Sequence, residues 1–281
     1  MTATTPNAVK RRRRGSGTLL TVITWIIGLA FFFPVLWLVV TAFKNEVDAS
    51  TDTPKIWFKP TLDQFRNVFD SGFWPYAGNS AFATAVSTLL VLALAIPAAY
   101  ALSVRPVPKT QDALFFFIST KMLPVVAVIV PLYIITQHIG MLDNIWTLVI
   151  LYTAMNLPIA VWMLRSFMAE VPGEVLEAAE VDGAGLMASF RSVLMPMIAP
   201  GIAATALICI IFAWNEFFFA VNLTSARAGT VPVFLVGFIT SEGLFFAQLA
   251  AAATLAALPV VIAGWIAQKQ LVRGLSMGAI K

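Results

Sequence analysis

The chain has 281 residues, of which 59% are hydrophobic and 11% are charged, and its mean hydropathy is +0.87. A soluble domain carries about 25% charged residues, so this composition excludes a soluble enzyme, a disordered chain and a nucleic-acid-binding protein. The net charge of +4 forms no basic face, because five of the 18 Lys and Arg residues lie in the run Lys10–Arg14. A single cysteine, Cys209, and a single histidine, His138, exclude a disulfide framework and a metal cluster. We therefore expect an integral membrane protein without catalytic or metal-binding residues.

Residues 1–17 form a basic N-terminal segment that leads into the first apolar stretch. This arrangement is similar to a secretory signal. The apolar stretch is longer than the usual 7–15 or so residues of a signal core, however, and no small-residue cleavage site follows it. We interpret it as a retained first span, with residues 1–17 in the cytoplasm.

Six apolar windows are long enough to cross a bilayer, which needs about 20 mainly apolar residues per helix. Their only formal charges are Lys121 and Glu216. Prolines occur in most of them, including Pro124 in the third, and can kink the helices. The windows do not alternate polar and apolar residues as β-barrel strands do. The windows predict an all-α polytopic membrane protein, with a transmembrane domain over residues 18–267 and a C-terminal tail over 268–281. The six windows are Thr18–Val40, Ala83–Leu102, Leu114–Gln137, Ile145–Leu164, Gly201–Val221 and Ala247–Ala267.

The orientation follows from the distribution of Lys and Arg, which favour cytoplasmic loops. With the N-terminus in the cytoplasm, alternating spans place 12 of the 18 basic residues inside and 5 outside, while Lys121 lies within a span. Both termini are therefore predicted to be cytoplasmic. We expect the Lys121 ammonium to extend to the cytoplasmic surface, because it lies only about seven residues inside the third window.

Two of the long connections fall on the outer side. Thr41–Phe82 combines acidic residues with aromatic ones, which suits an ordered cap at the headgroup level. Asn222–Phe246 contains the apolar stretch Val231–Phe238, which can re-enter the membrane edge.

The third long connection, residues 165–200, is predicted to be cytoplasmic. Pro172 can start a helix, and Gly183 and Gly185 break it. A second amphipathic helix then follows, and we expect prolines to end it before the fifth span. The prediction is two short helices at an angle on the membrane face, the second ending at Pro196 and Pro200.

The residue types at this bend suit contact with another protein. Ala178 and Ala179 let a second surface approach closely, Gly183 permits the sharp turn, and Glu177 and Asp182 offer carboxylates to a basic partner. On spacing alone, an amphipathic loop that lies on the membrane without a partner explains the pattern equally well.

The loop resembles the EAA motif of the permease subunits of ATP-binding-cassette importers, on residues Glu177, Ala178, Ala179, Asp182, Gly183, Ala184 and Phe190. The resemblance extends over most of the chain, through Asn79-Ser80, Pro131-Leu132-Tyr133, Trp214-Asn215-Glu216-Phe217 and the tail Gly274–Lys281. It points to the carbohydrate-importer branch and to the shorter of its two permeases, similar to the second maltose permease. A mannitol or sorbitol permease is the narrower expectation.

The resemblance implies a type I importer fold, with coupling helices, in a bacterial inner membrane. It also implies a heterodimer with a second permease, an ATPase homodimer that binds ATP and Mg, and an extracytoplasmic solute-binding protein. The chain has no G-x-x-x-x-G-K-[ST] loop, so we expect no catalysis and no cofactor of its own. The ATPase-coupling residues implied are the seven EAA-like positions given above.

Four polar or aromatic residues in the spans are candidates for the substrate path, because ionisable and amide groups are costly in a membrane. Glu216, with Trp214 and Asn215, suits a sugar that stacks on aromatic rings and hydrogen-bonds to carboxylates or amides. Glu216 also lies near the outer end of its span, where it can instead form a cap or pair with a neighbouring subunit. Asn156 is placed midway along the fourth span, where an interhelical hydrogen bond is the alternative.

Three other functions stay open from the sequence. One is an importer of the same kind for another polar solute. An ion-coupled secondary transporter needs an inverted repeat or a midplane proton relay, and neither is visible. A non-transporting scaffold leaves the EAA-like loop unexplained.

Overall fold

The computed structural model describes residues 14–104, 108–240 and 243–277. Among these residues, five helices are long and apolar enough to cross a membrane, and a bent pair of helices provides a sixth candidate span. The only strands among the described residues are β1 (Ile239–Thr240) and β2 (Gly243–Leu244), which have two residues each and pair in antiparallel orientation. The predicted all-α membrane fold is therefore confirmed.

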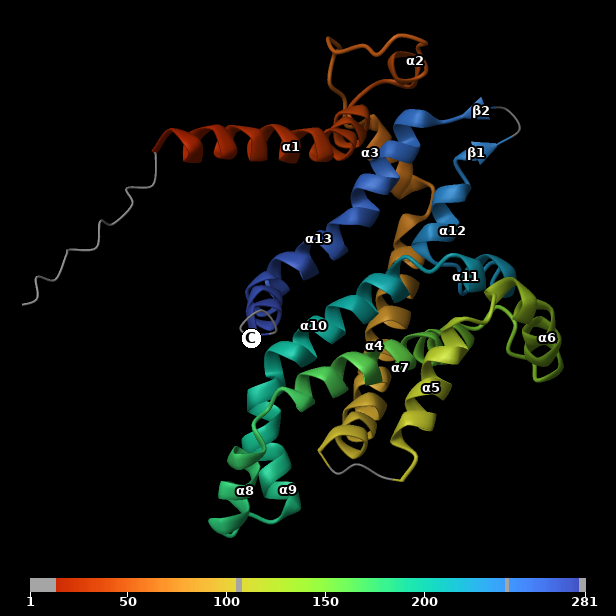
Figure 1. Cartoon of the computed structure of the whole chain (residues 1–281). Helices are drawn as coiled ribbons and strands as arrows, with labels where there is room; N and C mark the ends of the chain where they lie inside the picture. Colours follow the sequence, from red (N-terminus) through yellow and green to blue (C-terminus); the bar gives the residue numbers. More distant parts are fainter. Residues whose placement is uncertain (1–13, 105–107, 241–242, 278–281) are drawn as a thin grey trace, which may run out of the picture.

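The helices follow one another along the chain in Figure 1. The first helix begins at Arg14, inside the predicted N-terminal segment 1–17, and the last helix continues to Met277, inside the predicted C-terminal tail 268–281. Residues 1–13 and 278–281 of these two segments lie outside the described residues. The elements are α1 (Arg14–Thr41), α2 (Glu46–Ala49), α3 (Asp63–Asp70), α4 (Phe73–Ser103), α5 (Thr110–Lys121), α6 (Val125–His138), α7 (Ile145–Ala169), α8 (Gly173–Val181), α9 (Leu186–Ala188), the π-helical turn η1 (Ser189–Leu194), α10 (Met195–Trp214), α11 (Phe218–Leu223), α12 (Val231–Val236) and α13 (Phe246–Met277).

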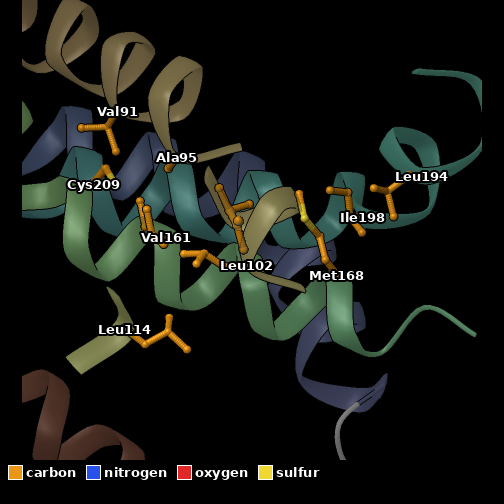
Figure 2. Close-up of a cluster of buried hydrophobic side chains, with 12 residues drawn as sticks. Val91, Ala95, Leu102, Leu114, Val161, Met168, Leu194, Ile198 and Cys209 are labelled. Carbon is orange, nitrogen blue, oxygen red and sulfur yellow. The ribbon is translucent and has the colours of Figure 1, made fainter. Parts of the chain in front are cut away.

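The centre of the bundle is the pair α4 and α7, against which α10 packs; α13 packs on α10. Small and branched apolar side chains fill this core, including Val91 and Ala95 from α4, Val161 from α7 and Ile198 from α10 (Figure 2). Because lipid tails are as apolar as these side chains, close packing rather than hydrophobic burial holds membrane helices together. The small residues in this core allow that close approach.

The third predicted span is broken. Helices α5 and α6 meet at a bend of 86° across Met122–Pro124. Pro124 lacks a backbone N–H and disfavours helical geometry in the residue before it, so α5 ends there and α6 begins immediately after the proline. Pro131 lies inside α6 without ending it.

The fifth predicted span differs at both ends. It ends early, because α10 stops at Trp214 and residues 215–217 separate it from α11. It also begins earlier than expected, since α9, η1 and α10 form one continuous helical segment, Leu186–Trp214, of 29 residues. The prediction that Pro196 and Pro200 end a separate helix is wrong. Pro196 lies at the first positions of α10, after a wide π-helical turn that accommodates the missing N–H.

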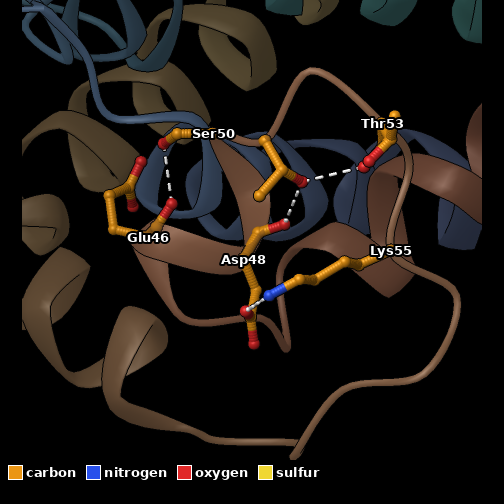
Figure 3. Close-up of polar contacts among 6 residues, drawn as sticks. Glu46, Asp48, Ser50, Thr53 and Lys55 are labelled. Carbon is orange, nitrogen blue, oxygen red and sulfur yellow. Dashed lines mark hydrogen bonds and ion pairs between the residues drawn. The ribbon is translucent and has the colours of Figure 1, made fainter.

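A small cap covers the α2–α3 end of the bundle. The Glu46 carboxylate accepts hydrogen bonds from the backbone N–H groups of Ala247 at 3.1 Å and Gln248 at 3.4 Å, and so joins α2 to the start of α13. Lys55 and Asp48 form an ion pair of 2.6 Å in the same cap (Figure 3). The predicted cap is therefore ordered, although α4 already begins at Phe73, within the segment assigned to it.

Lys44 lies in this cap with an exposed fraction of only 2%. Its ammonium stands 4.0 Å from the centre of the Trp37 ring. Burial lowers the pKa of Lys44 below its ordinary value, while the nearby Asp48 carboxylate acts in the opposite direction. The cation–π contact compensates part of the desolvation.

Helix α1 extends away from the other helices (Figure 1). In its span, Thr18–Thr41, the most apolar window is 0% buried. The last turns of α1 contact α13, through Leu38 among others. Most of the first span therefore has no packing partner in the part of the chain that the structure describes.

Candidate functional site

The α8–α9 turn, residues 173–188, is an ordered bend that backbone hydrogen bonds stabilise. Gly183 has φ of +82°, a left-handed conformation in which side chains are disfavoured. The N–H of Gly183 donates to the Glu180 carbonyl at 3.0 Å, and the N–H of Ala184 donates to the Ala179 carbonyl at 2.9 Å. These are the two bonds of a Schellman motif, which ends a helix with glycine. The helix end predicted at Gly183 is confirmed.

This turn projects beyond the ends of the spanning helices (Figure 1). Glu177, Ala178 and Asp182 are exposed there. Two apolar side chains beside them are also open to solvent, Val181 at 87% and Met187 at 68% exposure. The one ion pair among the described residues lies in the α2 cap, so neither Glu177 nor Asp182 is paired there. The tip thus offers an acidic and apolar surface on which the Glu177 and Asp182 carboxylates have no ion pair among the described residues.

Phe190 faces the bundle instead of the tip. Its half-buried ring makes an edge-to-face contact with Tyr100 of α4, with 5.2 Å between the centroids and 83° between the planes. Leu194, one turn later, is fully buried in the core of Figure 2. Of the predicted coupling residues, Phe190 therefore connects the turn to α4, whereas Ala179 and Ala184 are partly covered.

A hollow of about 480 Å³ lies between α8 and the ends of α4 and α7, with Ser103, Arg165 and Glu177 in its lining. Arg165 donates from Nε to the Leu102 carbonyl at 3.2 Å. The Ser103 hydroxyl donates to the Arg165 carbonyl at 3.5 Å. These contacts hold α4 and α7 together directly above the α8–α9 turn.

Asn156 is buried on α7 with 1% exposure. Neither its side-chain nitrogen nor its oxygen has a hydrogen-bond partner among the described residues, and the same holds for the hydroxyl of Tyr152 one turn earlier. The Tyr152 hydroxyl lies near Glu216 and Thr230, but in no hydrogen bond of standard geometry. A buried polar group without a partner costs about 1–3 kcal/mol. The interhelical hydrogen bond considered for Asn156 is not seen.

The structure gives Trp214, Asn215 and Glu216 local roles at the end of α10. The Trp214 indole N–H donates to the Ala256 carbonyl of α13 at 3.0 Å. The exposed Asn215 amide donates to the Ile211 carbonyl at 2.8 Å. The Glu216 carboxylate accepts from the backbone N–H of Phe219 at 2.8 Å and from that of Ala220 at 3.3 Å, so it caps the first turn of α11 from the residue before the N-cap, Phe217. The capping alternative for Glu216 is thus the one the geometry supports.

The sequence reasoning missed Asp143, which joins two loops at the end of the bundle opposite the α8–α9 turn. Its carboxylate accepts hydrogen bonds from the backbone N–H groups of residues 225–228, at 2.8–3.2 Å. Burial alone raises the pKa of Asp143, but these four backbone donors outweigh it, and the pKa lies below its ordinary value. No sequence signal reveals this clamp, because its donors are backbone groups more than 80 residues away.

Lys121 also departs from its expected position. Its ammonium donates to the Met155 carbonyl in the middle of α7 at 2.6 Å, instead of extending toward the surface. It is the last residue of α5, directly before the bend.

A family model, described as the binding-protein-dependent transport system inner membrane component, matches residues 92–277 of the chain. The chain belongs to this family. Among the relatives of this permease, a probable ABC transporter permease protein, y4oR of Sinorhizobium fredii, is 37% identical over 95% of the chain and 97% of the relative. The diacetylchitobiose uptake system permease protein DasC of Streptomyces coelicolor is 32% identical over 93% of the chain and 95% of its own length.

Solved structures agree on the fold of this permease. A chain of a bacterial ABC transporter involved in the import of the acidic polysaccharide alginate superposes with a TM-score of 0.72, over 94% of this chain and 99% of that one, at 22% identity. A chain of the MetNI methionine ABC transporter, in inward-facing conformations, gives a TM-score of 0.59 at 17% identity, over 76% of this chain and 99% of that one. The chain therefore has the ABC importer permease fold, and the fold class expected from the EAA-like motif is confirmed.

Proposed function

We propose that this chain is one of two permeases of an ATP-driven, binding-protein-dependent carbohydrate importer, and that its α8–α9 turn contacts the ATPase. The observation that carries the proposal is the exposed turn around Gly183, whose Glu177 and Asp182 carboxylates have no ion pair within the described chain. A protruding acidic and apolar surface of this kind fits a cleft with basic and apolar lining on a second protein.

The helical segment Leu186–Trp214 supports a lever mechanism. At 1.5 Å per residue, its 29 residues span about 43 Å, so it reaches from the turn across the bilayer. Phe190 and Tyr100 connect the same turn to α4. Movement of the turn when the two ATPase subunits close would therefore be passed to α10 and α4 together, as rigid-body rocking between inward-open and outward-open states.

The exposed α1 supports assembly with a second, different permease. A helix whose apolar window is 0% buried needs lipid or protein on all sides, and a heterodimer supplies protein. The proposed complex further contains an ATPase homodimer, which binds ATP and Mg, and an extracytoplasmic solute-binding protein. This chain then holds no cofactor and performs no catalysis. Trp214, Asn215 and Glu216 stay candidates for the substrate path beside the local contacts described above, and so does Asn156 with its unpartnered amide.

The carbohydrate class rests on named relatives. Diacetylchitobiose is the solute named for one relative, trehalose for a second, and melibiose, raffinose and stachyose for a third. Within this class a sugar alcohol is the narrower candidate, and another polar solute is the alternative. The excess of basic residues on the predicted inner side supports the proposal that both termini and the α8–α9 turn lie in the cytoplasm of a bacterial cell.

The test is uptake by proteoliposomes that contain both permeases and the ATPase, with the binding protein and sugars added outside. Gly183→Pro should abolish ATP-dependent uptake, because proline cannot adopt the φ of +82° that the turn requires. Gly185→Ala is the matched control: its φ is −67° and nothing lies within 4 Å of an added Cβ. Uptake driven by an ion gradient, with this chain alone, would refute the proposal.

A further inference from the structure

The break between α5 and α6 lies near the middle of the membrane. The last eight of the 12 residues of helix α5 lie in the apolar window that begins at Leu114, so Lys121 lies about 12 Å inside that window, close to half of a hydrocarbon core of roughly 30 Å. The partner of Lys121 agrees with this depth, because Met155 is the eleventh of the 25 residues of α7. A cation and a non-helical stretch of backbone thus occur together at mid-membrane depth.

The same stretch is exposed on the surface of the helix bundle. Lys121 is exposed, Met122 is 79% exposed and Leu123 is 55% exposed. Non-helical backbone at this depth is tolerated only where it is buried in protein or lines a water-filled cavity. A Lys ammonium that faces lipid in the middle of a span is likewise strongly disfavoured. Two independent features therefore direct this surface away from lipid.

The contact with Met155 uses one of the three N–H donors of the ammonium. Among the described residues Lys121 makes no ion pair, so its charge is not neutralised there. The Met155 contact fixes the depth of this ammonium. Two donors remain for water or for a solute.

We propose that residues 121–124 line the hydrated translocation path and that Lys121 makes this path electropositive at mid-membrane. The path would then accept neutral or anionic solutes rich in oxygen acceptors and exclude cationic ones. This inference rests on the proposed function as a permease, and it adds a specificity-determining residue to it.

The test measures electrostatics in the path without a solute. Met122→Cys places a thiol beside Lys121, and the native Cys209 is fully buried, so the unsubstituted chain serves as the blank. The complex in proteoliposomes is treated with two methanethiosulfonate reagents of similar size, one anionic and one cationic, with and without ATP. We expect Met122→Cys to react at least tenfold faster than Val261→Cys, a control in the unbroken helix α13 that is 58% exposed.

The charge of Lys121 is then tested with Lys121→Gln in the Met122→Cys chain. One charge about 7 Å away changes each rate roughly threefold, in opposite directions for the two reagents. The ratio of the anionic to the cationic rate should therefore fall at least fivefold. Lys59→Gln, in the exposed outer cap, should leave the ratio unchanged.

Each contrary outcome has a distinct meaning. If Met122→Cys does not react with either reagent in any state, protein or lipid covers the break and the inference is overturned. If both rates change equally in Lys121→Gln, the lysine only holds α5 against α7. ATP-dependent uptake is measured in the same proteoliposomes, so failure of the proposed transport function is seen separately from failure of this inference.

Discussion

The carboxylate of Asp143, whose four backbone donors are all seen in the structure, allows a quantitative prediction. One carboxylate holds the backbone N–H groups of residues 225–228 and so joins the loop before α7 to the loop after α11. Asn79 holds the same second loop from α4, through its amide, by donating to the Arg227 carbonyl at 2.8 Å. The Asp143→Asn substitution removes one acceptor oxygen and the negative charge while it keeps the shape of the side chain.

The size of the effect follows from the hydrogen bonds lost. Oδ2 of Asp143 accepts from Ala226 at 3.1 Å and from Arg227 at 3.0 Å, and an amide nitrogen at this position cannot accept either bond. Hydrogen bonds to charged groups contribute about 1.5–3 kcal/mol each, and water replaces part of that in a half-exposed site. We expect the local opening free energy of residues 225–228 to fall by about 2–4 kcal/mol.

Amide hydrogen exchange of the purified permease complex measures this directly. A loss of 2–4 kcal/mol corresponds to roughly 30- to 1,000-fold faster exchange at residues 225–228. Since the pKa of Asp143 in the folded chain lies below its ordinary value, the clamp contributes fully above the pKa of an unfolded Asp, near 3.9 or so. This contribution is lost only as the pH falls through the lower, folded pKa. Protection, corrected for intrinsic rates, should stay constant from about pH 7 to pH 5.

Two results would refute this reasoning. One is unchanged exchange at residues 225–228 in Asp143→Asn. The other is loss of protection between pH 7 and pH 5, which would place the pKa above its ordinary value. Asp52→Asn is the matched control, because Asp52 is an exposed carboxylate in the cap at the same end of the bundle. It should leave exchange at these residues unaltered.

Further predictions concern the helix contacts. Gly201→Ala should destabilise the protein by about 1–3 kcal/mol in thermal unfolding, because the added Cβ would lie 2.4 Å from the Phe167 ring. Adding Phe167→Ala to this variant should restore stability. A fully stable Gly201→Ala protein would contradict the close contact. Phe190→Ala should lower the uptake per ATP hydrolysed about fivefold while hydrolysis continues, since the ring contact is worth about 0.5–1.5 kcal/mol; unchanged coupling would exclude it as the link to α4. Glu216→Gln should lower the stability by about 1 kcal/mol, because it weakens the cap of α11, and it should leave the KM for uptake unchanged. A raised KM would instead support the sugar-contact hypothesis.

The sequence predicted what local chemistry alone decides. Apolar windows identified the spanning segments because a bilayer demands length and hydropathy from each helix separately. The end of α8 was predictable for the same reason, since glycine at a positive φ is a local requirement that Gly183 meets.

Features that depend on neighbours were not predictable. Pro124 ends α5 but Pro131 does not end α6, and Pro196 does not interrupt the segment Leu186–Trp214, so a proline alone does not tell a break from a tolerated kink. The same holds for Glu216. Its spacing fits a sugar contact as well as a cap, and the capping hydrogen bond becomes visible only when the Phe219 N–H is placed in space.

The bare first helix has a consequence for how the cell maintains this protein. A single copy exposes the most apolar window of Thr18–Thr41, which no described residue of the chain buries, and so resembles an incompletely assembled membrane protein to proteases that survey the bilayer. If the proposed second permease covers this helix, copies that never meet it should be degraded, and production of the two proposed subunits in unequal amounts would then be corrected after synthesis. Pulse-chase measurement of this chain, expressed with and without its partner permease, would show a shorter half-life for the orphan.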